Sequence, residues 1–306
     1  MRRRGSSRRV GWVLLWGAGL VLACGGGSPP KDGQTGEGQL GDQQYAGSEP
    51  AERIVAIAPG VTEMLFVLGL GDRVVGVGDY ARWPAGVAAK PKLGGLFDSR
   101  LEAIASLNPD LAVLLPSEER LRVHLEKMGV EVLTVRSETL ADIEEMAFLI
   151  GERCGVEEAS AAFLETWDRE FTPRGPPHST RVLLSVTREQ GRMADVLVSG
   201  PDTFLHELIG RLGAVNVMAD AQVSYPQVGL EEIIVRQPEV VIELQASPGN
   251  YESLRLDWDR LAGEVPLAEV CVKVVAGDHV LIPGPRLARL YRELEEALLE
   301  CAAVGE

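Results

Sequence analysis

The hydrophobic positions of this 306-residue chain alternate between short apolar runs and longer amphipathic segments. Apolar runs bounded by Gly, Pro or acidic residues predict buried strands, and apolar residues three and four positions apart predict helices. We expect strands at 53–58, 74–77, 111–115, 131–135, 181–186, 196–198, 240–244 and 270–275. We expect helices at 63–70, 101–107, 118–128, 140–153, 156–171, 204–212 and 286–302. This order of elements is typical of α/β proteins in which helices connect parallel strands.

One part of the pattern occurs twice, 129 residues apart (230 minus 101). LEAIASLNPDLAVL begins at Leu101 and LEEIIVRQPEVVIEL begins at Leu230, and each has a glutamate, Glu102 or Glu231, seven residues before a proline. Each copy predicts an amphipathic helix with an acid in its first turn, a proline that ends the helix, and a buried strand. We therefore expect two similar lobes with a cleft between them and one carboxylate at an equivalent place on each lobe.

The segment between the two copies contains a stretch without any strand pattern. Two helical stretches rich in Ala, Glu and Leu are separated by Gly155 and followed by three prolines. We predict an α/β fold of two Rossmann-like lobes with parallel sheets, at 52–150 and 179–306, joined by a long rigid helix at 151–178. A stiff connection of this kind predicts only a small closing motion between the lobes.

The N-terminus has the pattern of a secretory signal at 1–23. Five arginines precede an apolar run at 10–23 that is too short for a comfortable membrane span. The run ends in LVLAC, which resembles a lipobox and implies cleavage and lipidation at Cys24; an ordinary signal peptide with an incidental cysteine is the alternative. Residues 24–51 are rich in Gly, Ser, Pro, Gln and Asp and predict a flexible linker. We expect a domain in the periplasm or at the cell surface, anchored to the membrane by lipid.

Charge and cysteine content narrow the class of protein further. The formal net charge is -15, and removal of the five signal arginines moves it to about -20, which argues against a nucleic-acid partner. Besides Cys24 the chain has Cys154, Cys271 and Cys301, an odd number that cannot all pair internally. Cys271 and Cys301 are the favoured pair because both lie in the second half, but the sequence does not settle the pairing.

Motifs for catalysis or metal binding are scarce. The chain has no phosphate-binding loop of the Walker type and no Gly-x-Ser-x-Gly elbow. His206 and Glu207 begin like a zincin motif, but Gly210 stands where the second histidine would be needed. The four histidines cannot be paired by spacing into a metal site. We therefore expect a protein that is not an enzyme, with no catalytic residues, no metal site and no cofactor of its own.

Aromatic residues make up only 5% of the chain, so their positions carry information. Tyr80, Trp83, Phe97 and Tyr225 all fall in expected loops at strand ends, where parallel sheets present their binding sites. Amphipathic rings at these places favour a broad, partly apolar ligand, although each ring alone also fits a packing role.

A second group of candidates follows the last expected strand. Asp278 and His279 come directly after it, in a loop that would face the cleft. Their alternative role is that of ordinary turn residues.

Several segments together resemble a known family. RIVAIAPGVTE from Arg53, the two copies at Leu101 and Leu230, PDL at Pro109 and YPQV at Tyr225 resemble the periplasmic binding proteins that serve metal-chelate ABC importers, over roughly residues 52–300. The resemblance implies the class III substrate-binding fold, a metal chelate held between the lobes, and delivery to an ABC permease with its ATPase. It also implies a monomer.

The same resemblance suggests roles for individual residues. Glu102 and Glu231 match the family's two glutamates that meet permease arginines. Tyr80 and Tyr225 match aromatic positions of the corrinoid-binding members, although Tyr225 replaces a tryptophan. The tryptophan expected near Leu96 is missing, with Phe97 one position on, and His279 stands where another aromatic is expected. Under this hypothesis the rings of Tyr80, Trp83, Phe97 and Tyr225 enclose the ligand, and Asp278 and His279 bond to its edge.

The ligand itself stays open between three chelates. A corrinoid is favoured because it needs ring faces and few charges. Haem would need a Tyr or His donor, which Tyr80, Tyr225 or His279 can supply, and an anionic ferric siderophore would need Arg82 or Arg286. Two other classes remain as alternatives: a hydrolase or oxidoreductase on a doubly wound fold, and a sensor or scaffold lipoprotein without an importer.

Overall fold

The computed structural model describes residues 49–175, 179–189, 191–192, 194–247, 251–264 and 270–304. The expected signal at 1–23, Cys24 and the linker up to residue 48 lie outside the described residues. All described residues belong to one unit, Gly41–Glu306.

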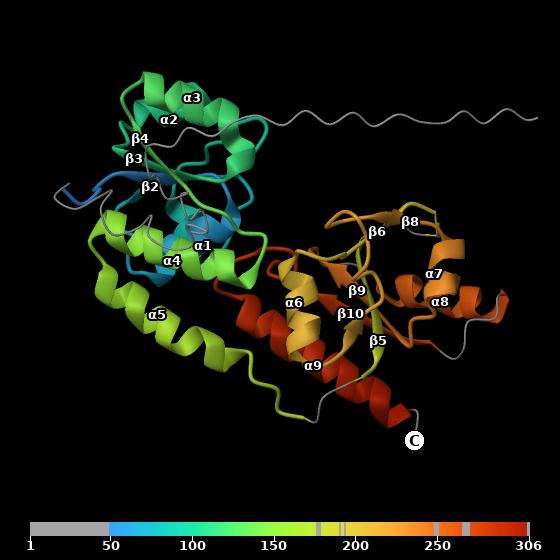
Figure 1. Ribbon diagram of the computed structural model, residues 1–306. Helices are drawn as coiled ribbons and strands as arrows, with labels where there is room; N and C mark the ends of the chain where they lie inside the picture. Colours follow the sequence, from blue (N-terminus) through green and yellow to red (C-terminus); the bar gives the residue numbers. More distant parts are fainter. Residues whose placement is uncertain are drawn as a thin grey trace, which may run out of the picture. The chain divides into compact units, whose positions relative to one another are not determined.

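The first lobe is built on a parallel four-stranded sheet with the order β2-β1-β3-β4 (Figure 1). Its strands are β1 (Ile54–Ala56), β2 (Val74–Val77), β3 (Leu111–Leu114) and β4 (Glu131–Thr134). Its helices are α1 (Pro59–Val67), η1 (Ala85–Ala89), α2 (Leu101–Ser106), η2 (Pro116–Glu118) and α3 (Glu119–Lys127). The central strands β1 and β3 are fully buried, as expected for a sheet covered by helices on both faces.

Helix α1 begins earlier than the hydrophobic pattern predicts. Pro59 occupies its first turn, where a missing backbone N–H costs nothing, so the helix starts directly after β1. Thr62 therefore lies inside the helix, and its hydroxyl donates to the carbonyl of Ala58 at 3.1 Å.

The connection between the lobes is a pair of helices packed side by side. Helix α4 (Leu140–Cys154) is capped by Thr139 and ends at Gly155, whose φ of 65° is left-handed. Helix α5 (Glu157–Glu170) then returns along α4, and the hydroxyl of Ser160 donates to the carbonyl of Ala147 at 2.8 Å. Within the expected connection at 151–178, helix α5 covers nearly all of the helical stretch expected at 156–171, and residues 176–178 lie outside the described residues.

The second lobe has a six-stranded sheet with the order β10-β9-β5-β6-β8, and β7 pairs with β5. Its strands are β5 (Arg181–Thr187), β6 (Val196–Val198), β7 (Val215–Asn216), β8 (Gln227–Val228), β9 (Val240–Gln245) and β10 (Cys271–Ala276). Its helices are α6 (Phe204–Arg211), α7 (Leu230–Arg236), α8 (Tyr251–Glu264) and α9 (Leu287–Val304).

The two-lobed α/β fold is confirmed, but the second sheet is mixed rather than purely parallel. Strands β5, β7, β9 and β10 pair in parallel, whereas β6 pairs antiparallel with both β5 and β8. The connection from β5 to β6 is too short for the helical crossover that a parallel pair requires.

A disulfide joins Cys271 of β10 to Cys301 of α9, which confirms the favoured pairing. Cys154 is buried and free.

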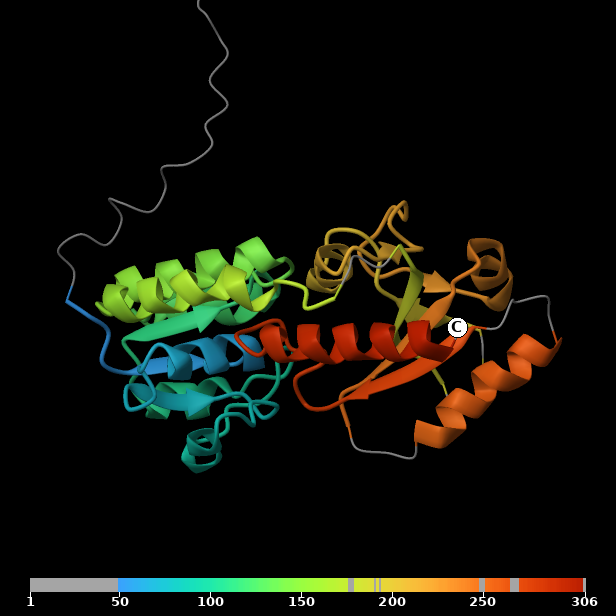
Figure 2. The ribbon, with the colours of Figure 1, turned by 90° about the horizontal axis from the view of Figure 1, so that it is seen from below.

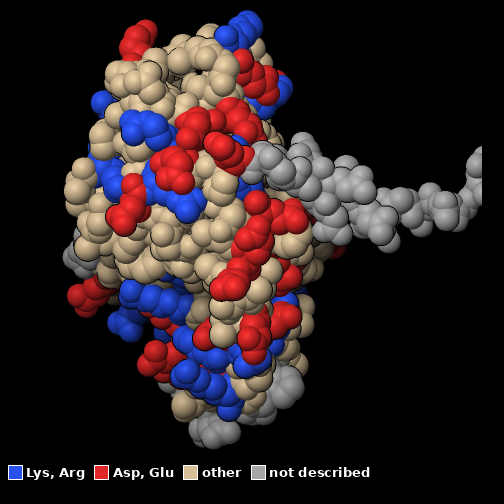
Figure 3. Space-filling view, turned by 90° about the vertical axis from the view of Figure 1, so that its left-hand side faces the viewer, with Lys and Arg blue, Asp and Glu red and all other residues tan. Residues whose placement is uncertain are grey.

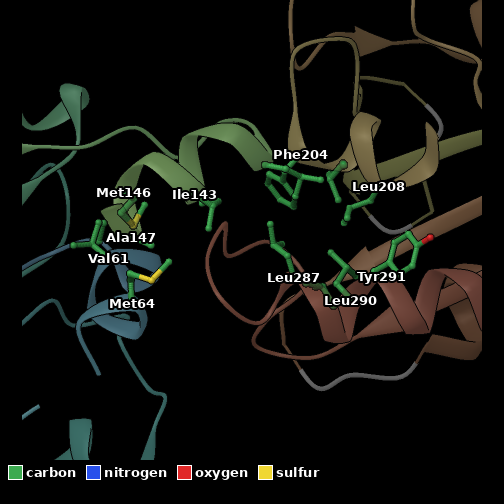
Figure 4. Close-up of a cluster of buried hydrophobic side chains, with 14 of the residues drawn as sticks. Val61, Met64, Ile143, Met146, Ala147, Phe204, Leu208, Leu287, Leu290 and Tyr291 are labelled. Carbon is green, nitrogen blue, oxygen red and sulfur yellow. The ribbon is translucent and has the colours of Figure 1, made fainter. Parts of the chain in front are cut away.

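The two lobes share one hydrophobic core. Figure 4 shows Val61 and Met64 of α1 beside Met146 and Ala147 of α4, and Ile143 of α4 on the side toward Phe204 of α6 and Leu287 of α9; all belong to one buried cluster. The backbones also meet, because a Cβ on Gly60 would lie 2.0 Å from the carbonyl oxygen of Pro283 in the loop before α9, which Figure 2 shows next to α1. Separating the lobes would expose this apolar surface to water, at a free-energy cost of about 25 cal/mol for each Å² exposed. The shared core supports the expectation of a stiff junction.

Candidate functional site

An arginine of the second lobe is bound to an acid of the first lobe. The guanidinium of Arg286, just before α9, donates to both carboxylate oxygens of Glu63 on α1 at 2.9 and 2.5 Å. It also donates to Asp278 at 2.7 Å. The side chains of Arg286 and Glu63 are 9% and 2% exposed. Arg286 is thus held in place at the junction by two carboxylates.

The protonation of the two acids follows from their surroundings. Burial raises the pKa of Glu63, and the hydrogen bonds and charge of Arg286 offset only part of that effect. Burial also disfavours the charged form of Asp278, but there the interactions with Arg286 outweigh it, so the pKa of Asp278 lies below its ordinary value.

Trp83 completes this cluster. The guanidinium carbon of Arg286 lies 5.4 Å from the centre of the Trp83 ring, a cation–π distance. The structure therefore brings together Trp83 and Asp278 with Arg286, which the sequence offered as a siderophore contact, and adds Glu63. Sequence reasoning missed Glu63; the available signal was an acid on the otherwise apolar segment VTEMLFV of α1.

Tyr80 and Phe97 lie in adjoining loops of the first lobe, and both rings are largely exposed, at 68% and 89%. The backbone N–H of Asp79 donates to the carbonyl of Gly94 at 2.8 Å, and Arg100 donates to the Asp79 carboxylate at 2.7 Å. These contacts fix the two loops to each other. Exposed aromatic rings on a fixed support are typical of a binding surface.

Phe97 also borders a pocket of about 350 Å³ in the first lobe. The pocket is lined by apolar side chains, two serines and three ionisable groups: Leu96, Phe97, Ser99, Leu101, Ser117, Glu118, Arg120, Leu121 and His124.

Glu118 is the buried polar member of this pocket, with 2% of its surface exposed. One carboxylate oxygen, Oε2, accepts from the backbone N–H of Leu115 at 2.8 Å. Oε1 has no hydrogen-bond partner among the residues that the structure describes. Burial raises the pKa of Glu118 to about 7. Sequence reasoning missed this residue, whose only signal is an acid shortly after the apolar run of β3.

Tyr225 belongs to the second lobe, in the loop before β8. Its side chain is partly exposed, and burial together with the negative charge of Glu138 raises its pKa to about 12. Because Glu138 precedes α4, Tyr225 lies near the connection between the lobes.

His279 lies inside the protein, whereas the sequence placed it in a loop facing the cleft. Its ring is fully buried, with Nε2 2.7 Å from the Glu293 carboxylate on α9. The ring also packs on Gly277, where an added Cβ would lie 2.5 Å from it. In this structure His279 cannot bond to the edge of a ligand at the surface, whereas its neighbour Asp278 remains partly exposed.

The two glutamates of the repeated stretch have equivalent positions. Glu102 lies in the first turn of α2 and Glu231 in the first turn of α7, and both are exposed. Figure 1 shows these helices in different lobes.

On the face drawn in Figure 3, acidic and basic side chains are mixed and form no broad basic surface.

Within the described ranges, no cluster of three or more His, Cys, Asp or Glu side chains is arranged to hold a metal ion. Nor does any helix in that part of the chain combine the length and apolarity needed to cross a membrane.

Comparison with known proteins places the chain in a family. The chain is 26% identical to an uncharacterized ABC transporter substrate-binding lipoprotein, YvrC, of Bacillus subtilis, over 95% of this chain and 97% of that protein. It is 28% identical to a vitamin B12-binding protein of Vibrio parahaemolyticus, over 81% of this chain and 90% of the other. The fold also matches the periplasmic heme-binding protein HutB of Vibrio cholerae, with a TM-score of 0.68, 22% identity, and coverage of 80% and 98%. Residues 54–254 match the periplasmic binding protein family, which confirms the resemblance seen in the sequence; the chain belongs to that family.

Proposed function

We propose that this protein is the substrate-binding component of an ABC importer, that it holds a corrinoid between its lobes, and that it delivers this ligand to a permease and its ATPase. The relatives named for vitamin B12 binding and for ABC transport support this role. The proposed ligand contacts are Tyr80, Trp83, Phe97, Tyr225 and Asp278.

The choice of ligand rests on one observation, the hydrogen bonds that Arg286 already makes to two carboxylates. An anionic ferric siderophore needs cations at its site, and Arg82 and Arg286 are the two that the sequence offers. Arg82 is exposed on the first lobe, but Arg286, at the junction of the lobes, is already bound by Glu63 and Asp278. An added anion would have to displace one of these carboxylates or share the guanidinium with it. A ligand with little net charge and broad apolar faces does not face this competition, and the exposed rings of Tyr80 and Phe97 suit it.

Haem is the second candidate, supported by the likeness in fold to the heme-binding protein. Iron would need an axial donor, and two of the three sequence candidates are poorly disposed for that role. His279 is buried against Glu293, and the raised pKa of Tyr225 disfavours its phenolate form. Tyr80 is exposed and remains the candidate donor.

Titration calorimetry of the purified protein with cyanocobalamin, haemin and a ferric siderophore tests the proposal. We expect heat of binding with cyanocobalamin, weakened by Tyr80→Ala and Phe97→Ala. Phe148→Ala on α4 is a matched control, because this ring is exposed but is not one of the proposed ligand contacts. Binding of haemin alone would favour the haem alternative, and loss of that binding in Tyr80→Phe would identify the donor.

Delivery to a permease separates an importer from a sensor or scaffold of the same fold. The proposal assigns permease contact to the exposed Glu102 and Glu231, anchoring to a lipid on Cys24, and a monomeric state to the free protein. Exposed ion pairs add little affinity, so the two glutamates would act mainly on encounter rate and orientation.

A further inference from the structure

The first-lobe pocket contains one polar atom whose bonding the fold leaves incomplete. Glu118 lines the pocket and is almost fully buried, yet only Oε2 has a donor, the backbone N–H of Leu115. A buried carboxylate oxygen without a donor is costly, because burial removes its water and nothing in the described structure replaces it. Groups of this kind are uncommon in folded proteins, and a ligand that supplies the missing donor would relieve the cost.

The residues around Glu118 indicate what kind of ligand would bring such a donor into the pocket. Phe97 at the border of the pocket is the most exposed of the four predicted aromatic residues, and Ser99 and Ser117 add hydroxyls to the lining. The pocket therefore combines an apolar platform with a few polar groups at its wall, which suits the edge of a flat ligand whose face lies on the ring.

The two basic residues of the same pocket lie at its exposed side. Arg120 and His124 of α3 are both exposed, and Nδ1 of His124 lies 2.6 Å from the carbonyl oxygen of Arg120. Neither side chain forms an ion pair or a hydrogen bond with Glu118 within the described structure. The buried wall of the pocket thus carries the acid, and the exposed rim carries Arg120 and His124.

We infer that Glu118 is a specificity-determining residue that accepts a hydrogen bond from a primary amide at the edge of the bound chelate. This inference rests on the proposed function and narrows its ligand to a chelate with an amide-bearing edge. A chelate with a carboxylate at the same place would set two acidic groups against each other in a site that already disfavours charge, so it would bind more weakly. An amide N–H instead completes the bonding of Oε1.

The substitution Glu118→Gln reverses the polarity at this point with little change in shape. The glutamine oxygen would accept from the N–H of Leu115, as Oε2 does now, and the amide nitrogen would occupy the place of Oε1. A donor would then face the donor of the ligand. We expect cyanocobalamin to bind Glu118→Gln about tenfold or more weakly than it binds the unchanged protein. Glu119→Gln is the matched control, because Glu119 is an exposed neighbour paired with Arg122 and does not line the pocket.

A matched set of ligands tests the amide directly. We would titrate cyanocobalamin and derivatives in which a single peripheral amide is hydrolysed to a carboxylate, near pH 8, where Glu118 is mostly ionised. We expect one of these derivatives to bind the unchanged protein about tenfold or more weakly than cyanocobalamin does. We expect the same derivative to regain at least part of that lost affinity when it binds Glu118→Gln. Thermal unfolding of each variant shows whether it is folded.

The outcomes separate this inference from the proposed function. If the unchanged protein binds cyanocobalamin and folded Glu118→Gln binds it equally well, the inference fails and the proposed function stands. If every monocarboxylate binds like the parent compound, the inference also fails. If the unchanged protein does not bind cyanocobalamin, the proposed corrinoid ligand fails and takes the inference with it.

Discussion

Arg286 and Glu63 are separated by 223 positions in the chain and form a bidentate ion pair at the junction of the lobes. Each side chain is nearly buried, so the pair has lost most of its contact with water. A buried pair of this kind fixes orientation more than it adds stability, because desolvation offsets much of the attraction. In this protein it holds Arg286 beneath the ring of Trp83, at the place where the first-lobe loops meet the second lobe.

Removing one partner of this pair should destabilise the protein strongly. Arg286→Met leaves Glu63 buried without its counter-charge, and we expect a loss of about 3 kcal/mol or more in the free energy of unfolding. The double variant Glu63→Leu with Arg286→Met should recover much of that loss, because no unpaired charge remains between these two positions. Urea denaturation measures both effects.

The matched control is Arg169→Met, which breaks an exposed pair with Glu165 on α5. We expect it to change the free energy of unfolding by about 0.5 kcal/mol or less. Equal effects of Arg169→Met and Arg286→Met would contradict the assigned role of the buried pair.

Glu118 should make stability depend on pH. Its folded-state pKa of about 7 lies above the ordinary value of 4.5. The folded state therefore holds the proton more tightly than the unfolded state, and this contribution to stability is fully present below 4.5 and is lost as pH rises through 7. We expect Glu118→Gln to be more stable than the unchanged protein at about pH 8, by on the order of 2 kcal/mol, and to show a smaller difference at about pH 5. Urea denaturation at both pH values checks this, and a pH-independent difference would argue against a raised pKa.

The disulfide should stabilise the second lobe. Cys271 and Cys301 are 30 positions apart, and a loop of that size corresponds to roughly 3.5 kcal/mol of stabilisation. The double variant Cys271→Ser with Cys301→Ser should therefore unfold at lower denaturant concentration. A reducing agent should shift the unchanged protein in the same direction and leave the variant unaffected. A variant as stable as the oxidised protein would contradict this account.

Charge reversal of the repeated glutamates should separate binding from transport. Glu102→Arg with Glu231→Arg should leave the affinity for cyanocobalamin unchanged, since both residues lie in exposed first turns of helices. Uptake of labelled cyanocobalamin by cells should fall by at least tenfold if these residues meet permease arginines. Glu158→Arg, an exposed acid in the first turn of α5, is the matched control. Normal uptake with both glutamates reversed would favour a sensor or scaffold instead.

The sequence predicted the elements with strong periodicity, and it was less informative about residues whose role depends on distant contacts. The repeated stretch placed Glu102 and Glu231 correctly in the first turns of two helices because an acid, a helix pattern and a proline stop are all local signals. Glu63 and Glu118 were missed because their importance comes from the burial of their carboxylates, and burial depends on segments far away in the chain. His279 was expected at the surface of the cleft, but its partner Glu293 on α9 keeps the ring inside. The antiparallel β6 was missed because strand direction follows from connection length and pairing rather than from the apolar run itself.

The position of cobalt in crystals grown with cyanocobalamin tests directly whether the protein holds a corrinoid between its lobes. Anomalous diffraction at the cobalt absorption edge locates the metal without any assumption about the ligand. We expect a single strong peak between the lobes, with the corrin ring in contact with Tyr80 and Phe97 from the first lobe and Tyr225 from the second. A peak elsewhere on the molecule, or no peak in crystals soaked to saturation, would contradict it.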